Sequence, residues 1–308
     1  MESSATAHET FPAAEPREPR LNTAPRYVAD RLGFVDPVAQ PLARLIRNQL
    51  GSGPVKALLS GSSLGHALHP LLTDVVIGCW SSATILDLTA GRQSERATRI
   101  LTATGLAAAA PTVASGWSDW ADTSVDTEVR RVGVVHALTN ASAVALYATS
   151  IAAGRDSRLK AALLRLAGAG LLCFGGFLGG HLAHARGVGV DQTVFEHGPT
   201  DWTPVLAADE LQDGGLTPAT TDGVRLLLAR TEGRLVAMSD RCTHRGGALH
   251  EGELENGCVT CPLHGSVFRL ADGSVVSGPA TSPQPVYDVR VRDDQVEVRA
   301  ARAPLTAS

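Results

Sequence analysis

The chain has 308 residues, a formal net charge of −4 and 44% hydrophobic residues. This length allows one to three domains, and the slightly acidic balance lacks the basic footprint of a nucleic-acid-binding protein. The five cysteines are too few for a disulfide-rich scaffold. The hydrophobic residues are concentrated between about residues 62 and 186, so regional composition is more informative than the average.

The N-terminal region has two parts. Residues 1–27 are rich in Pro, Glu, Ala, Ser and Thr, which predicts a disordered tail, and they lack the apolar stretch of a secretory signal peptide. Residues 28–61 form an amphipathic or interfacial segment, in which 36–50 places apolar residues at helical spacing beside Arg44 and Arg47. Such a helix lies on an anionic membrane surface or packs on its own domain, and the pattern leaves both open.

Three long stretches without Asp, Glu, Lys or Arg follow, at 100–118, 132–154 and 166–185. Each can cross a hydrocarbon core of about 30 Å at 1.5 Å per residue. A fourth candidate, at about 70–90, contains Asp74 and Asp87 around an apolar stretch. We therefore expect four spans over 62–186; the alternative is a soluble bundle of Ala-rich helices.

From about residue 202, short runs of β-forming residues alternate with turn sequences such as Asn256-Gly257 and Asp293-Asp294. This alternation of short strands and turns predicts a small antiparallel sandwich or barrel over 202–302. Residues 187–201 are then a linker and 303–308 a tail. The expected fold is multi-domain, with an all-α four-helix transmembrane bundle followed by an all-β domain.

Two turn segments of the β domain carry the strongest chemical signal. Cys242 and His244 are followed, after sixteen residues, by Cys261 and His264. Two thiolates and two neutral imidazoles can bind a structural zinc ion, but finger-type zinc sites usually pair Cys with Cys and His with His. One ligand of each kind from each loop suits a two-iron cluster.

These residues resemble the Rieske iron–sulfur family, over about 202–302. The resemblance implies that Cys242 and Cys261 hold the first iron of a [2Fe-2S] cluster and that His244 and His264 hold the second. It also implies that the imidazole edges are the electron port. Only 44 residues follow His264, which leaves no room for the second iron domain of Rieske oxygenases. The chain is therefore expected to be an electron-transfer component that works with a reductase or oxidoreductase, rather than a self-contained catalyst.

Five further residues bear on the cluster by the same resemblance. Gly247 and Leu263 stand where respiratory Rieske subunits have disulfide-forming cysteines, so the domain is similar to Rieske ferredoxins. Ser266 matches a serine that hydrogen-bonds the cluster sulfur in high-potential members, whereas Phe268 replaces a tyrosine, and Pro279 resembles the proline loop that covers the cluster. With fewer donors, we expect a reduction potential below the respiratory class.

Ionisable residues gather at one end of the predicted spans. Because consecutive spans alternate in direction, the starts of the first and third spans and the end of the fourth emerge on the side that carries the β domain. The residues concerned are His66, His69, Asp74, His136, His181 and His184. Such groups in a membrane usually mark function, so we expect a haem b or quinone site; the alternative is a set of interfacial histidines satisfied by water and backbone.

The helical half, over about 60–186, also resembles a bacterial four-helix membrane family of unknown function, through Gly65-His66-Ala67-Leu68-His69-Pro70. The resemblance implies an integral protein of the bacterial plasma membrane, in contact with lipid. Lys and Arg counts nearly tie between the two sides, and the basic amphipathic segment favours a cytoplasmic β domain.

The leading interpretation is a membrane-anchored one-electron carrier that exchanges with a haem or quinone among the spans. The alternative is a membrane redox sensor or scaffold whose cluster transfers no electrons to a substrate.

Overall fold

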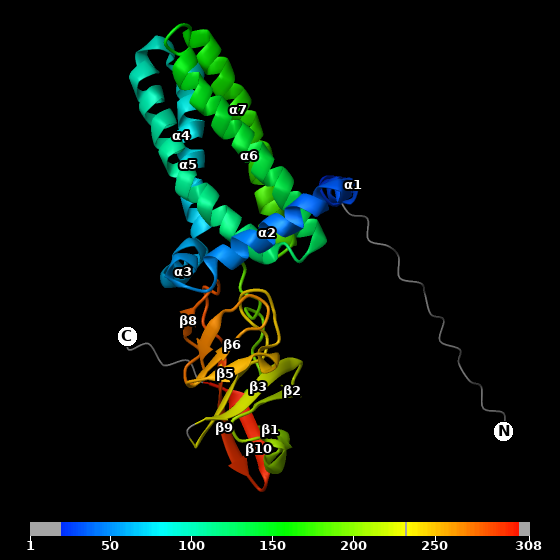
Figure 1. The fold of residues 1–308 in the computed structure, drawn as a ribbon. Coiled ribbons are helices and arrows are strands. Elements are labelled where there is room, and N and C mark those ends of the chain that lie inside the picture. Colours follow the sequence, from blue (N-terminus) through cyan, green and yellow to red (C-terminus); the bar gives the residue numbers. More distant parts are fainter. Residues whose placement is uncertain (1–19, 232, 302–308) are drawn as a thin grey trace, which may run out of the picture.

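The computed structural model describes residues 20–231 and 233–301. Residues 1–19, which are most of the predicted N-terminal tail, and the predicted tail 303–308 lie outside the described residues. Helices occupy one half of the molecule and strands the other (Figure 1). The predicted multi-domain fold, a helical bundle followed by an all-β domain, is confirmed.

Four long helices form the bundle in the described part of the chain. They are α4 (Leu68–Thr89), α5 (Glu95–Thr123), α6 (Thr127–Ala153) and α7 (Arg158–Gly180). A π-helical turn, His181–Ala185, extends α7. The side chains of Asp126 and Ser157 cap the first turns of α6 and α7. Short connections between these helices produce an up-and-down bundle.

Stacked aromatic rings fill the middle of the bundle. Trp80 of α4 and Tyr147 of α6 have ring centroids 4.2 Å apart and planes inclined by 12°. A Cβ atom at Gly105 would clash with the Trp80 ring, and one at Gly168 would lie 2.8 Å from the Tyr147 ring. Glycine at these two positions therefore allows close helix packing, as is common between helices in membranes.

Three helices in the described part of the chain are long and apolar enough to cross a membrane. They are Leu68–Thr89, Thr127–Ala153 and Arg158–Ala185. Helix α5 has 29 residues, which is ample length, but it buries Thr98, Thr102, Ser115 and Ser118. These polar side chains lower its apolar content, so the fourth crossing stays a prediction.

Shorter helices precede the bundle. They are α1 (Arg20–Arg31), α2 (Asp36–Leu50) and α3 (Pro54–Ser60). Helix α2 crosses the bundle at the end that faces the strands (Figure 1). The helix predicted over 36–50 is confirmed; it buries Ala39 and Ala43 and exposes Val38 and Leu45.

The predicted disorder is wrong for residues 20–27, which belong to α1. Ala29 on this helix packs with Val132 and Leu178 of the bundle. Its carbonyl oxygen also accepts a hydrogen bond from Nη1 of Arg131 at 3.0 Å. The stabilising partners are distant in the sequence, so local composition does not reveal them.

The described part of the β domain has ten strands. They are β1 (Thr203–Ala207), β2 (Leu216–Thr221), β3 (Val224–Thr231), β4 (Arg234–Ser239), β5 (Glu253–Glu255), β6 (Cys258–Thr260), β7 (Val267–Arg269), β8 (Val275–Ser277), β9 (Val286–Arg292) and β10 (Gln295–Ala300). One sheet has the order β1-β10-β9-β4-β3-β2 and the other β5-β6-β7-β8. All named pairs are antiparallel, as predicted.

Two predicted turns connect hairpins of this domain. Asn256 and Gly257 between β5 and β6 have φ of 50° and 71°, and Asp293 and Asp294 between β9 and β10 have φ of 49° and 60°. Two successive positive φ values match the right-handed twist of the flanking strands. The connection at 187–201 contains no helix or strand, in keeping with the predicted linker.

Candidate metal centre

The first cysteine–histidine loop follows β4. The Cys242 N–H donates to the Gly247 carbonyl at 2.9 Å, and the Gly246 N–H donates to the Cys242 carbonyl at 2.8 Å. Gly246 has a φ of 71°, a left-handed conformation that glycine adopts without steric cost. The tight turn buries Cys242 in the domain core and leaves His244 at its surface.

The second loop, between β6 and β7, repeats this construction. The Cys261 N–H donates to the Ser266 carbonyl at 2.8 Å, and the Gly265 N–H donates to the Cys261 carbonyl at 3.0 Å. Gly265 also has a φ of 71°. Sequence reasoning missed these matched glycines, although each stands four residues after its cysteine. The repeated turn positions Cys261 and His264 like the first pair.

The two loops face each other and bring the four donor side chains together. The Cys242 and Cys261 thiols hydrogen-bond to each other. The His244 and His264 rings are perpendicular, with centroids 5.0 Å apart. Among the described residues, no three His, Cys, Asp or Glu side chains converge on one ion-sized point. The donors form a thiol pair and an imidazole pair.

The thiol pair favours the thiolate form of Cys261. The pKa of Cys261 is lowered to about 7, chiefly because the Cys242 thiol donates a hydrogen bond to it. The same interaction, together with burial, raises the pKa of Cys242. Backbone N–H groups of Leu263 and His264 also point at the Cys261 sulfur. Thiolate is the form that binds a metal.

Both imidazoles are neutral near pH 7, which is the form that binds a metal. Burial lowers the pKa of His264 to about 4, with a further contribution from the positive charge of Arg47. Burial and the neighbouring His264 ring lower the pKa of His244 well below its usual value. Nδ1 of His244 is buried and accepts or donates no hydrogen bond within the described residues. A buried ring nitrogen without a partner fits a role as an iron ligand.

The predicted neighbouring residues surround this centre. A Cβ atom on Gly247 would lie 3.0 Å from both Cys261 Sγ and Leu263 Cγ, so positions 247 and 263 face each other across the loops. The Ser266 hydroxyl accepts a hydrogen bond from the Ala280 N–H at 3.1 Å. Pro279 is buried beside it, and Phe268 is fully buried in β7.

The histidine rings also face the helical domain. Nε2 of His244 lies 3.9 Å from Oδ2 of Asp122 on α5. Asp122 forms an ion pair with Lys56 of α3, with Nζ and Oδ2 2.6 Å apart. Sequence reasoning missed Lys56 and Asp122, because no local pattern joins residues so far apart in the chain.

The membrane residues predicted to hold haem or quinone are only partly brought together. His69 and His136 meet edge to face, with ring centroids 6.4 Å apart. Nδ1 of His69 hydrogen-bonds the Thr112 carbonyl at 2.9 Å, and Nδ1 of His136 hydrogen-bonds the Gly175 carbonyl at 2.9 Å. The Asn140 amide lies 3.1 Å from Nε2 of His136. These two rings therefore have protein partners.

The other four predicted residues do not join this pair. Nε2 of His181 lies 3.0 Å from Oε1 of Glu128, and Nδ1 of His66 lies 3.1 Å from the carbonyl oxygen of the neighbouring Ala67. Asp74 is exposed on the outer face of α4, and His184 is also outside the bundle core. The structure therefore does not gather the six predicted residues in one site. The alternation of spans determines the end of the bundle at which a residue lies, but not the direction in which its side chain points.

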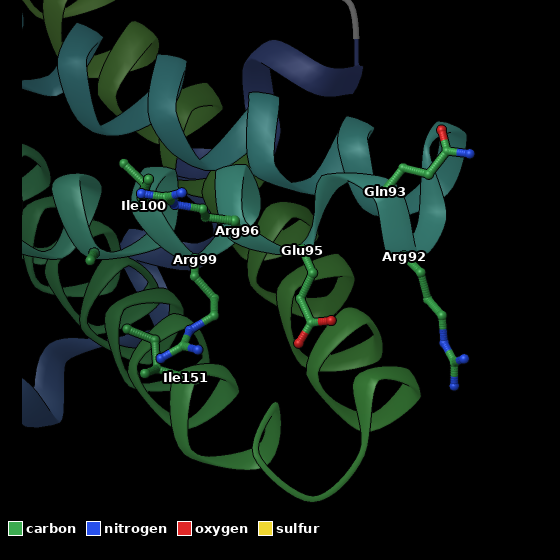
Figure 2. A pocket seen from close by; sticks show the side chains of 8 residues that line it. Arg92, Gln93, Glu95, Arg96, Arg99, Ile100 and Ile151 are labelled. Atoms are coloured by element: carbon green, nitrogen blue, oxygen red, sulfur yellow. The ribbon is translucent and has the colours of Figure 1, made fainter.

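A different feature lies at the opposite end of the bundle. Figure 2 shows the side chains that line a hollow, among them Arg92, Arg96, Arg99 and Glu95, with Ile151 beside the end of the Arg99 side chain. These arginines belong to the turn before α5 and to its first turns. The hollow is separate from the cysteine–histidine loops and marks a basic end of the helical domain.

The geometry of the two loops defines a Rieske-type iron–sulfur domain. Residues 201–288 match the family described as Rieske [2Fe-2S] domain, and residues 65–192 match Predicted membrane protein (DUF2231). The chain belongs to the Rieske [2Fe-2S] family and joins that domain to one of the DUF2231 family.

Individual relatives cover the β domain. The chain is 36% identical over 98 residues to the anthranilate 1,2-dioxygenase ferredoxin subunit of Burkholderia cepacia, covering 32% of this chain and 91% of that protein. It is 34% identical over 98 residues to ferredoxin CarAc of Metapseudomonas resinovorans, covering 32% and 92%. A solved complex of reduced oxygenase and oxidized ferredoxin in carbazole 1,9a-dioxygenase matches at 31% identity and a TM-score of 0.31, covering 33% of this chain and 97% of that chain.

These findings identify a membrane protein with a Rieske electron-transfer domain, whose cofactor is a [2Fe-2S] cluster.

Proposed function

We propose that the protein is a membrane-anchored one-electron carrier in which Cys242 and Cys261 bind one iron and His244 and His264 bind the other. The observation that carries the proposal is the pair of matched loops, which puts the two thiols in contact and the two imidazole centroids 5.0 Å apart. When bound, the cluster takes up and releases one electron.

The chain's own residues prepare this site. Backbone N–H groups after each cysteine point at its sulfur and stabilise thiolate charge. Burial keeps the imidazoles neutral, so that they can donate a ring nitrogen to iron. Packing of Gly278 against the second loop, where a Cβ would lie 2.7 Å from the Gly265 carbonyl oxygen, covers one side of the site.

The partner is a redox protein. Relatives of this domain include the ferredoxin subunit of anthranilate 1,2-dioxygenase and the ferredoxin component of a naphthalene 1,2-dioxygenase system, which supports electron exchange with a reductase or an oxidoreductase. Each ring of His69 and His136 already has hydrogen-bond partners in the protein. A haem or quinone bound there would have to displace some of these hydrogen bonds. Visible spectra of the purified protein test for haem directly.

The test is metal analysis and EPR of the full-length protein purified in detergent. Two irons and two sulfides per chain, with a mixed-ligand signal after dithionite reduction, are expected. His244→Ala and His264→Ala should abolish that signal. His250→Ala is the matched control, because His250 pairs with Asp240 at 2.9 Å instead of facing the other loop. Bound zinc, or a signal that survives His244→Ala, would refute the ligand assignment.

We also propose a bacterial plasma-membrane location with the Rieske domain in the cytoplasm. The basic segment around α2 supports this orientation, whereas Arg92, Arg96 and Arg99 at the opposite end oppose it. A reporter fused after the last residue distinguishes the two. Activity of a fused alkaline phosphatase, which requires export, would reverse the assignment.

A further inference from the structure

The histidine edge of the Rieske domain is in contact with the helical domain of the same chain. Nε2 of His244 lies 3.9 Å from Oδ2 of Asp122, and the Asp122 backbone lies within hydrogen-bonding reach of His264. The His244 side chain is 13% exposed and the Asp122 side chain 2% exposed. The edge through which electrons would leave is therefore covered by α5.

The Asp122 carboxylate is held in place from its other side. Nζ of Lys56 lies 2.6 Å from Oδ2 of Asp122 and also donates to the Ser118 hydroxyl at 2.7 Å. Despite this ion pair, Oδ2 accepts no well-aligned hydrogen bond within the described residues. A buried carboxylate is costly unless its oxygens receive hydrogen bonds, so this atom is suited to a further donor.

His244 can supply that donor. On the ligand assignment proposed above, the unpartnered Nδ1 binds iron, which places the ring proton on Nε2. Nε2 faces Asp122, and a movement of about 1 Å would bring the two atoms within hydrogen-bond distance. The carboxylate oxygen that pairs with Lys56 and the remaining ring proton are thus opposite each other.

Hydrogen bonds on both sides of the histidine edge hold the helical domain and the Rieske domain together. The Ser62 hydroxyl donates to the Gly278 carbonyl at 2.7 Å, beside the second loop. Nη1 of Arg245, in the first loop, donates to the carbonyls of Arg186 and Gly187 at 3.1 Å each. These contacts leave the two imidazole rings over the end of α5.

We propose that this end of the helical domain is the docking surface for the Rieske histidine edge, with Asp122 as a positioning residue that accepts the Nε2–H of His244. The inference rests on the proposed ligand assignment. It has two consequences: the carboxylate charge disfavours uptake of an electron nearby, and the docked helices shield the edge from soluble proteins.

The first test measures the reduction potential of full-length protein in detergent by EPR-monitored titration. Asp122→Asn should raise the equilibrium constant for reduction about tenfold, which is about 59 mV for a one-electron couple. Asp119→Asn is the matched control, since it makes the same substitution about one helical turn earlier on α5. Equal shifts in both variants, or no shift in Asp122→Asn, would overturn the proposal.

The second test measures access to the edge. We compare reoxidation of the reduced protein by soluble cytochrome c, which must dock, with reoxidation by ferricyanide, which is small. Asp122→Asn/Lys56→Gln removes both charges, leaves the net charge unchanged and should increase the cytochrome c rate several-fold relative to the ferricyanide rate. A wild-type protein that reacts with cytochrome c as fast as the double variant would show that the edge is free.

Ser62→Ala provides a variant outside the ion pair. It removes the hydrogen bond to Gly278 and should also increase the cytochrome c rate; an unchanged rate here would count against docking even if the double variant does not fold. Iron content and the Rieske EPR signal are recorded for every protein. A wild-type chain without the signal refutes the ligand assignment, whereas an intact signal with unchanged potentials and rates refutes only the docking.

Discussion

Nε of Arg165 lies 2.6 Å from Oδ2 of Asp87, and the two side chains are 6% and 4% exposed. Nη2 of Arg165 also donates to Oδ1 at 3.0 Å, so the pair is bidentate. It ties α7 to α4 inside the bundle. Arg165 and Asp87 thus neutralise each other, although they are far apart in the sequence.

Arg165→Met should destabilise the bundle by about 3–5 kcal/mol, because it leaves the Asp87 carboxylate buried and uncompensated. The double variant Arg165→Met/Asp87→Leu should recover most of that loss, since a buried ion pair can often be replaced by apolar side chains. Unfolding of the detergent-solubilised protein by denaturant titration gives both values. A double variant as unstable as the single one would contradict this account.

The contact between α2 and α6 should depend on pH. Asp36 accepts hydrogen bonds from Nη2 of Arg131 at 2.6 Å and Nε of Arg130 at 3.0 Å. These two guanidinium groups, Arg131 first, hold the pKa of Asp36 well below its usual range. The folded state therefore prefers the carboxylate. Its contribution is present above the unfolded pKa of about 3.9 and is lost as the pH falls through the lower folded pKa.

We expect Asp36→Asn to lower the melting temperature at pH 7 and to reduce the additional loss that the wild type shows when the pH falls below about 4. Thermal melts of both proteins at a series of pH values measure this difference. Asp30→Asn, which removes an exposed carboxylate from α1, should follow the wild-type profile. Parallel profiles for wild type and Asp36→Asn would rule the mechanism out.

The two metal-centre loops should accept an engineered disulfide. A Cβ atom on Gly247 would lie 3.0 Å from Cγ of Leu263, which is within the reach of a bridge between the two positions. Gly247→Cys/Leu263→Cys should form the bond under oxidising conditions and stabilise the domain by up to about 3 kcal/mol. Thiol counting by mass spectrometry and a chelator-challenge half-life for the bound iron report on it. If both engineered thiols stay free, like the single added thiol of the Leu263→Cys control, the loops do not face each other in this way.

Ser266 should raise the reduction potential. Its hydroxyl accepts from the Ala280 N–H, so its own proton is available for donation. If that hydrogen bond favours the reduced state by about 1 kcal/mol, Ser266→Ala should lower the potential by about 40 mV. Ser274→Ala, in the turn between β7 and β8, should leave it unchanged. An EPR-monitored titration decides, and a potential that stays constant or rises in Ser266→Ala argues against the donor role.

The sequence was most informative where the signal is local. Cys242, His244, Cys261 and His264 stand in short loops whose spacing alone indicates paired thiols and imidazoles, and the structure brings them together. The helix over 36–50 also appears with the expected bounds, because its apolar residues recur at helical spacing.

The sequence was less informative where long-range packing decides. Helix α1 depends on Val132 and Leu178 far along the chain, and the Lys56–Asp122 pair joins residues of separate helices. Alternation of spans correctly indicates which end of a helix carries a residue. It does not fix rotation about the helix axis, so Asp74 points outward while His69 meets His136.

The connection at 187–201 joins the end of the bundle directly to the domain that contacts it. A short tether of this kind holds two surfaces at an effective concentration of the order of millimolar. Contacts too weak to assemble separate molecules then suffice to bring the surfaces together. The covalent fusion can therefore tolerate a readily reversible association, because the Rieske domain that leaves α5 remains within reach of it.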